Sequence, residues 1–359
     1  MRNKLLRGTE LLRALRTEIS AALPGAWSIT SKAEEPRQGG RAERALTLTA
    51  PDGVAGQLLV EVRDVVEPRD VPRVLRQLES SPDSSLLVAA PYLSPRVREL
   101  LQDRGAGWFD ATGNMRVQLD RPAVFLDRTG ARRSPFTDAD DRRLKSLKGP
   151  GAARVVRALL DFAVPLGVRA LAEVAEVGAA TSSRVLELLL REELIERDAQ
   201  GRVVGVRKLS LARRWTADYG LAASNQAVPM LAARGIDQVF TELKKYDGRY
   251  AITAEAATRP YLPRGRAAVA PLGLLTIYVS DATAAAERLN LRAVDRGANV
   301  VLVEPFDAVV YRGVTMKSGL SFAAPSQVVV DLLTGPGRAP EEGASLIEVL
   351  AREDEGWTR

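Results

Sequence analysis

The stretch Lys148–Val206, KGPGAARVVRALLDFAVPLGVRALAEVAEVGAATSSRVLELLLREELIERDAQGRVVGV, carries the most ordered hydrophobic pattern in the chain. In three successive segments, VVRALLDF, VRALAEVAEV and SSRVLELLL, apolar residues recur every three or four positions, which predicts three amphipathic helices. Gly178 marks the turn before the third helix, and Thr181 or Ser182 is its expected N-cap. The remaining residues, IERDAQGRVVGV, predict two short strands around a turn at Gly201.

Three helices followed by a strand hairpin is the order of a winged helix-turn-helix, whose third helix enters the major groove of DNA. Charge favours the same interpretation, because the segment from Arg142 to Arg214 holds 15 Lys and Arg against 8 Asp and Glu, a net +7, whereas the whole chain has +6. A local positive excess favours DNA, since each neutralised phosphate releases counterions. The alternatives are a solvated charged face and a protein-docking module, because the fold alone does not define its partner.

The winged-helix interpretation assigns contacts with double-stranded DNA to three places. Residues at the start of the third helix are expected to reach base edges and phosphates. Cations on the hairpin and just before the first helix are expected to reach phosphates only. In chain order the predicted set is Lys145, Lys148, Arg154, Thr181, Ser182, Ser183, Arg184, Arg197 and Arg202.

Composition removes several classes of chemistry. The 359 residues include no Cys and no His, which excludes disulfides, thiolate nucleophiles and Cys-based zinc sites and removes the usual general base. Carboxylate-held magnesium remains open. The chain has no run of 18 apolar residues and begins with a charged amphipathic helix, so we predict no membrane span, no signal peptide and a cytoplasmic, nucleoid-associated protein.

The predicted fold class is a multidomain combination of α/β and α+β domains. Residues 1–134 alternate strands and helices and form the first predicted domain. A polar linker at 135–147 leads to the winged helix-turn-helix at 148–215, and 216–359 form a C-terminal α+β domain.

The element order of residues 1–134 resembles the PD-(D/E)xK restriction-endonuclease fold. Those enzymes hold a metal through an acidic residue on one strand and an acid-x-Lys triplet on the next, and the metal activates water. Here Glu61 opens the triplet, Arg63 stands where Lys is expected, and Asp52 lies in a Pro-Asp-Gly turn. The preceding strand, ALTLTA, lacks a carboxylate, and Arg is a poorer proton shuttle than Lys. We therefore expect an inactive domain without metal or cofactor; in the rival interpretation Asp52, Glu61 and Arg63 form a nuclease site.

The motif WFDATGN, at 108–114, contains Asp110 and Asn114. Asp110 either supports Glu61 from the same side of the sheet or shapes a turn between two strands with Gly113. An Asp followed within a few residues by a Gly between two strands is more often a turn residue, so we favour the second alternative.

Phrases spread over about 145–345 resemble proteins with an AbiEi-like antitoxin domain. They include LKSLKGPGAARVVRALLD, GANVVLVEPFDAVVYR and APSQVVVDLLTGPGRAPEEG. The resemblance implies a winged-helix transcriptional repressor of a type IV toxin–antitoxin operon, with a nucleotidyltransferase toxin encoded nearby. This chain carries some 140 residues ahead of the resembling part.

These observations predict a sequence-specific DNA-binding regulator without catalytic activity. Its expected partners are double-stranded DNA, a second copy of the chain, and a toxin or defence-system protein. Two rivals stay open: a metal-dependent nuclease guided by the winged helix, and an adaptor that serves a defence or replication complex.

Overall fold

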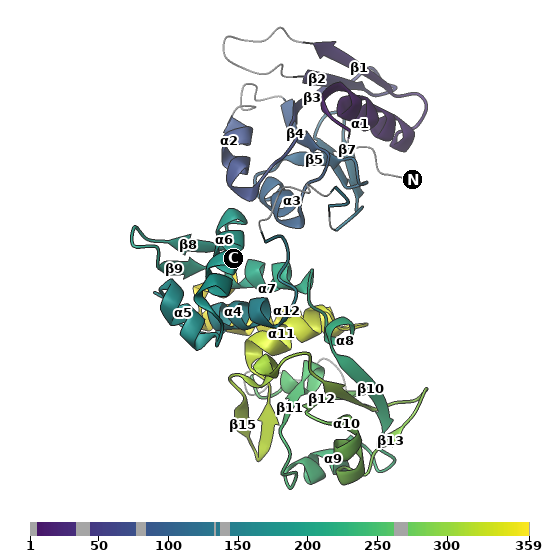
Figure 1. Cartoon of the computed structure of the whole chain (residues 1–359). Helices are drawn as coiled ribbons and strands as arrows, with labels where there is room; N and C mark the ends of the chain where they lie inside the picture. Colours follow the sequence, from purple (N-terminus) through teal and green to yellow (C-terminus); the bar gives the residue numbers. More distant parts are fainter. Residues whose placement is uncertain are drawn as a thin grey trace. The chain divides into compact units, whose positions relative to one another are not determined.

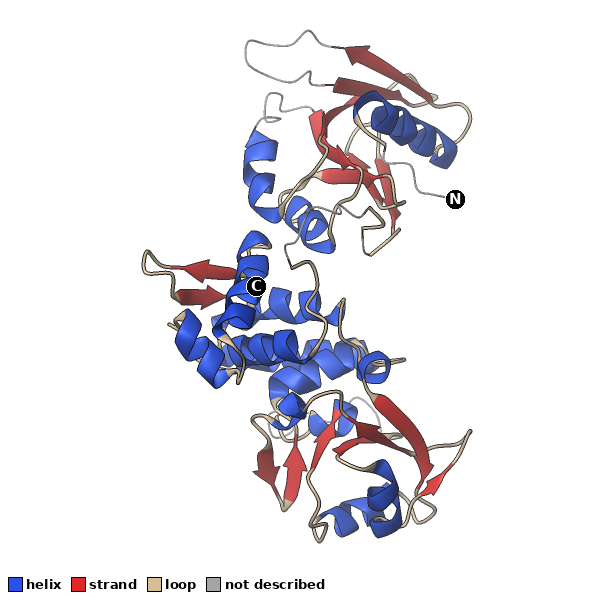
Figure 2. Ribbon diagram, viewed as in Figure 1, coloured by secondary structure: helices blue, strands red, loops and turns tan. Residues whose placement is uncertain are grey.

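The computed structural model describes residues 6–33, 44–76, 84–132, 134–136, 144–261 and 272–358 (Figure 1). The chain divides into two compact units, with the main boundary between Arg142 and Arg143. Both units mix helices with strands, which confirms the predicted mixed α/β, multidomain class (Figure 2). Residues 137–143 of the predicted linker lie outside the described residues. None of the described helices is both long and apolar enough to cross a bilayer.

The first unit is built on a sheet whose strands follow one another in chain order. The strands are β1 (Ser28–Ala33), β2 (Arg44–Thr49), β3 (Ala55–Val62), β4 (Ser84–Ala90), β5 (Gly107–Asp110), β6 (Met115–Leu119) and β7 (Val124–Arg128). Neighbours are antiparallel except β3–β4 and β4–β5, which are parallel. Parallel neighbours need a crossover, and here η1 (Pro68–Asp70) with α2 (Val71–Arg76), and then α3 (Pro95–Gln102), supply the two crossovers.

Helices cover both faces of this sheet. On one face α1 (Gly8–Ala22) packs Leu11, Leu15 and Ile19 against strand residues such as Leu58. On the other face α2 and α3 pack against a cluster that includes Val88 of β4 and Trp108 of β5. Since side chains alternate along a strand, Glu61, the register partner of Val88, lies on the α2–α3 face.

The second unit begins with three helices and a hairpin, in the predicted order. The elements are α4 (Pro150–Asp161), α5 (Val168–Val174), α6 (Ala179–Arg191), β8 (Ile195–Arg197) and β9 (Val203–Val206). Gly201 makes the hairpin turn with φ +76°, in the left-handed region that glycine tolerates. Leu166, between α4 and α5, pairs with Val203 through two backbone hydrogen bonds of 2.9 and 2.8 Å. The hairpin is therefore tied back to the α4–α5 connection.

The start of α6 differs from the prediction. The helix begins at Ala179, so Thr181 and Ser182 lie within its first turn and are not its N-cap. The backbone amides of Thr181 and Ser182 donate to the carbonyl of Gly178. A local sequence pattern predicts helix ends only to within a few residues, and the turn at Gly178 starts the helix earlier.

A second mixed sheet follows, with the strand order β13-β10-β14-β12-β11-β16-β15 among the described residues. Its strands are β10 (Gln226–Leu231), β11 (Tyr250–Thr253), β12 (Leu275–Val279), β13 (Arg292–Ala293), β14 (Val300–Glu304), β15 (Thr315–Lys317) and β16 (Leu320–Phe322). The accompanying helices are α7 (Lys208–Thr216), α8 (Leu221–Ser224), α9 (Ile236–Leu243), η2 (Ala254–Ala257), α10 (Ala282–Arg288), η3 (Ala308–Tyr311), α11 (Pro325–Leu333), α12 (Ala339–Glu353) and η4 (Glu355–Thr358).

One hydrophobic core runs across the position, 215/216, where the sequence analysis places a domain boundary. Leu159 of α4, Trp215 of α7, Leu302 of β14 and Val329 of α11 belong to the same buried cluster. Helix α11 packs on both α4 and α7, and also on β11. The three-helix segment and the C-terminal sheet therefore form one compact unit, because each buries an apolar face on α11.

Candidate nucleic-acid interface

The exposed start of α6 carries three of the predicted contact residues. Arg184 is exposed, and its Nε donates to the carbonyl of Ala180 at 3.2 Å. Ser183 is partly exposed, with Oγ 3.4 Å from a carboxylate oxygen of Glu187. Thr181 is also partly exposed. These side chains remain accessible to a partner that approaches the first turns of α6.

Ser182 does not belong to this surface. It is 0 % exposed, and its Oγ donates to the carbonyl of Val168 at 3.4 Å. The prediction that Ser182 contacts DNA is therefore wrong. Ser182, Val185 and Leu189 are spaced by three and four residues, so they share one face of α6, and that face is buried.

The hairpin presents Arg202 more fully than Arg197. The Arg202 side chain is 52 % exposed, and its Nε lies 2.7 Å from Oδ2 of Asp198 within the turn. Arg197 is partly buried, and its Nε and Nη2 atoms are enclosed without a hydrogen bond to any described residue. Arg202 is thus the better placed of the two for a phosphate.

Two exposed lysines, Lys145 and Lys148, precede α4. The segment between them is held by Asp218, which accepts from the Leu147 amide at 2.7 Å and from Ser146 Oγ at 2.9 Å. Burial acts to raise the pKa of Asp218, but hydrogen bonds from Arg214 and Leu147 outweigh it and lower the pKa. The ionised carboxylate consequently fixes the backbone from which both lysines project.

Arg154 is occupied inside the molecule. Its Nε and Nη2 lie 3.0 Å from the two carboxylate oxygens of Asp307, and its Nη1 donates to the carbonyl of Glu176 at 3.3 Å. The hydrogen bonds with Asp307 raise the pKa of Arg154. Arg154 therefore joins α4 to η3, and this bidentate ion pair leaves it less available for a phosphate than the predicted contact requires.

The sequence analysis did not single out Arg157, the most buried cation among the described residues of this unit. It is 0 % exposed and donates to Gln327 Oε1 at 2.7 Å, Ser326 Oγ at 3.1 Å and Asp161 Oδ2 at 2.9 Å. It also donates to the carbonyls of Val309 and Arg312. The sequence does place Arg157 on the apolar face of the α4 helix, and a cation on a buried face needs a partner inside the protein.

The network continues to Asp331 of α11, which is 0 % exposed. Its carboxylate accepts from Tyr219 at 2.7 Å, Tyr278 at 2.8 Å, Gln327 at 2.9 Å and Thr253 at 2.5 Å. Burial raises the pKa of Asp331, opposed by these hydrogen bonds. Burial likewise raises the pKa of Tyr219 and Tyr278 well above the usual value. The group is enclosed and satisfied, so we assign it a structural role.

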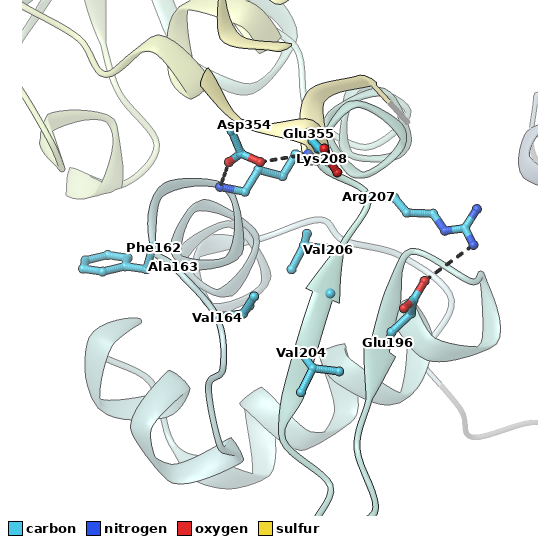
Figure 3. A pocket seen from close by; sticks show the side chains of 12 residues that line it. Phe162, Ala163, Val164, Glu196, Val204, Val206, Arg207, Lys208, Asp354 and Glu355 are labelled. Carbon is cyan, nitrogen blue, oxygen red and sulfur yellow. Dashed lines mark hydrogen bonds and ion pairs between the residues drawn. The ribbon is translucent and has the colours of Figure 1, made fainter. Parts of the chain in front are cut away.

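A cleft of about 480 Å³ lies beside the hairpin, between the end of α4, β9 and residues 354–356 (Figure 3). Lys208 closes one side, with Nζ 2.8 Å from Asp354 Oδ2 and 2.8 Å from the carbonyl of Leu160. Phe162 and Val204 are 40 % and 42 % exposed. A Cβ on Gly356 would lie 2.9 Å from the carbonyl oxygen of Val206, so glycine allows the C-terminal segment to approach the hairpin closely.

The residues proposed for a nuclease site do not assemble in the first unit. Glu61 is 5 % exposed, and its Oε1 lies 2.5 Å from Nε of Arg63. Asp52 precedes β3 and accepts from the Val54 amide at 3.0 Å, whereas Glu61 is near the other end of that strand. The strand rise separates them by about 20 Å. Asp52 and Glu61 therefore cannot share a metal ion, and within the described ranges no three Asp or Glu gather as metal ligands.

Asp110 shapes the turn between β5 and β6, as favoured from the sequence. It is 0 % exposed and accepts from the amides of Leu93, Thr112 and Asn114, and from Nδ2 of Asn114 at 2.8 Å. Asn114 in turn accepts from Arg98 Nη1. Asp110 and Glu61 lie on the same face of the sheet, on β5 and β3, with β4 between them. The hydrogen bonds of the Asp110 carboxylate given above go to its own turn and to Leu93, not to Glu61.

Comparison of the chain with protein families, with curated proteins and with solved structures found no match.

Proposed function

We propose that the protein is a double-stranded DNA-binding regulator, and that α4, α5, α6 and the β8–β9 hairpin act as a winged helix-turn-helix. The single observation that carries the proposal is the exposed first part of α6, from which Arg184 points outward, together with the β8–β9 hairpin, whose turn carries the exposed Arg202. A helix that is braced behind and free at its N-terminal turns is what major-groove recognition requires.

Two further observations support the proposal. A single β-bridge between Leu166 and Val203 ties the hairpin to the connection between α4 and α5, so the hairpin is held against the helices. The +7 charge of 142–214 adds electrostatic attraction for the DNA backbone. The resemblance to AbiEi-like antitoxins favours a repressor, with a toxin as a second partner.

The role of Arg184 can be tested on a duplex selected from a random-sequence pool by the full-length protein. We expect Arg184→Ala to weaken binding to that duplex by about 1–3 kcal/mol and to relax its sequence preference. Arg202→Ala should weaken selected and random duplexes to a similar extent, since a phosphate contact carries no sequence information. Equal effects of both variants on both duplexes, measured by fluorescence anisotropy, would contradict these assignments.

A second prediction concerns the salt dependence of DNA affinity. Replacing Lys145 and Lys148 with alanine should reduce the slope of log K against log salt by about 1–2, near one per lost phosphate contact. Arg154→Ala is the matched control: because Asp307 already pairs with Arg154, the slope should not change. An affinity that is independent of salt in the unmodified protein would reject DNA binding and favour an adaptor.

We also propose that the protein does not cut nucleic acid. The support is the Glu61–Arg63 ion pair and the distance of Asp52 from it. With Mg²⁺ or Mn²⁺, we expect supercoiled DNA, single-stranded DNA and RNA to stay intact. Cleavage that disappears in Glu61→Ala would establish the nuclease instead, because a contaminating enzyme would survive that substitution.

A further inference from the structure

A small pocket of about 290 Å³ lies in the second unit. Its lining residues lie between 243 and 321, so none of them belongs to α6 or to the β8–β9 hairpin. Its walls come from the end of α9, the turn Tyr246–Tyr250, the end of η3 and the hairpin β15–β16. The volume is close to the lower limit of small-molecule sites. Any occupant is therefore compact.

Three tyrosines form the aromatic part of this pocket. The rings of Tyr246 and Tyr250 meet edge to face at 5.9 Å, and Tyr250 Oη accepts from the Ser321 amide at 3.2 Å. A Cβ on Gly248 would collide with the Tyr246 ring, so glycine at this position lets the ring fold back over the turn. Tyr311 provides the third ring. The aromatic walls are thus preformed by packing and by one backbone hydrogen bond.

The charge of the pocket is positive. Lys244 and Arg249 line it, whereas its lining includes no Asp or Glu within the described part of the chain. The side chains of Lys244 and Arg249 make neither an ion pair nor a hydrogen bond with the described residues, and the Arg249 guanidinium lies 4.3 Å from the centre of the Tyr311 ring. The guanidinium edge remains available for a carboxylate or phosphate.

Tyr311 carries a buried polar atom that needs a partner. The residue is 8 % exposed, and its hydroxyl oxygen is enclosed without a hydrogen bond to the described residues. Such groups usually pair with a water or a ligand. Arg249, which lies over the ring, is itself exposed, so a shift of its side chain would admit a partner to this hydroxyl.

From the aromatic walls, the unpaired cations and the unsatisfied hydroxyl, we infer that this pocket binds a small aromatic anion. The ring of the ligand would pack on the tyrosines, its anionic group would pair with Arg249 and Lys244, and a polar atom would bond to Tyr311 Oη. Both an aromatic carboxylate and a nucleoside monophosphate have this chemistry. The inference stands independently of DNA binding.

The test is calorimetric titration of the full chain with salicylate, benzoate, AMP and UMP. Acetate, inorganic phosphate, benzamide and adenosine are the controls that lack either the ring or the charge. We expect at least one aromatic anion to bind more tightly than its matched controls. Binding of salicylate or benzoate identifies the ligand as an aromatic carboxylate, and binding of AMP or UMP identifies it as a nucleotide. Failure of every aromatic anion to bind, or equal binding of its controls, would overturn the inference.

Two variants then locate the site. Arg249→Gln should weaken binding about tenfold or more, since it removes a charged hydrogen-bond donor. Tyr311→Phe should weaken binding about three- to tenfold, yet leave the thermal unfolding midpoint unchanged or higher, because it deletes a hydroxyl that is unsatisfied without ligand. Arg292→Gln, on the edge strand β13, is the control and should bind as the unmodified protein does. Binding that both pocket variants retain in full would place the ligand elsewhere and refute the assignment.

Discussion

Replacing Arg157 with alanine is expected to lower the free energy of unfolding of the second unit by about 3–5 kcal/mol. The guanidinium is fully buried and satisfies Gln327, Ser326 and Asp161 as well as two backbone carbonyls. Without it, the Asp161 carboxylate, whose side chain is 16 % exposed, loses its cation, and the buried side chains of Gln327 and Ser326 lose their donor. Arg157→Lys should recover less than half of the loss, because one ammonium group cannot replace a planar fork.

Urea unfolding, followed by hydrogen exchange in peptides from α4 and α11, measures this loss separately in the second unit. Arg169→Ala is the matched control, since Arg169 is exposed on α5, and it should change the free energy of unfolding by less than about 0.5 kcal/mol. If Arg157→Ala behaves like that control, the buried network does not hold α4 to α11.

Asp110→Ala is expected to destabilise the first unit by about 3 kcal/mol or more. Asp110 accepts from the amides of Leu93, Thr112 and Asn114 and from the side chains of Thr112 and Asn114. Bonds to a charged acceptor contribute about 1.5–3 kcal/mol each, and buried donors left without a partner add a penalty. Asp110→Asn keeps the shape but turns an NH₂ group toward donors, so it should be destabilising as well.

The control for Asp110 is Asp52→Ala, which removes one exposed turn hydrogen bond and should cost about 1 kcal/mol or less. Hydrogen exchange of peptides from β5 and β6 gives the unfolding free energy of the first unit. Equal free energies of unfolding for Asp110→Ala and Asp52→Ala would show that the Asp110 turn does not contribute to stability. If Mg²⁺ instead raises the free energy of unfolding of the first unit, and Asp110→Ala abolishes that increase, a metal ion binds at this position.

Much of the local structure could be predicted from the chain. Apolar residues with a period of 3.6 predicted α4, α5 and α6, and Gly201 predicted the hairpin turn. Both predictions succeed because these features depend only on residues that are close together in the sequence. The end of a helix is a weaker signal. The prediction therefore placed the start of α6 near Thr181, and the structure has it at Ala179.

The candidate site could be predicted only in part. Lys145, Lys148, Arg184 and Arg202 are exposed, as the proposed DNA contact requires. Whether a given polar residue faces outward depends on how the helices pack, which the sequence pattern leaves open. Ser182 is enclosed for this reason. The ion pair of Arg154 could not be foreseen because its partner is 153 positions away along the chain.

By itself, the sequence determined the chemistry that side chains can supply and the local elements. Without His or Cys, and with a positive excess confined to 142–214, it favoured binding over catalysis. Only the tertiary structure decided which charges are free. Arg157 meets Gln327 from 170 positions away. Glu61 pairs with Arg63 at the end of β3, whereas Asp52 lies in the turn before that strand. The contact of Arg157 with Gln327 leaves no periodic trace, because it arises when α4 and the C-terminal sheet bury their apolar faces on the same helix, α11.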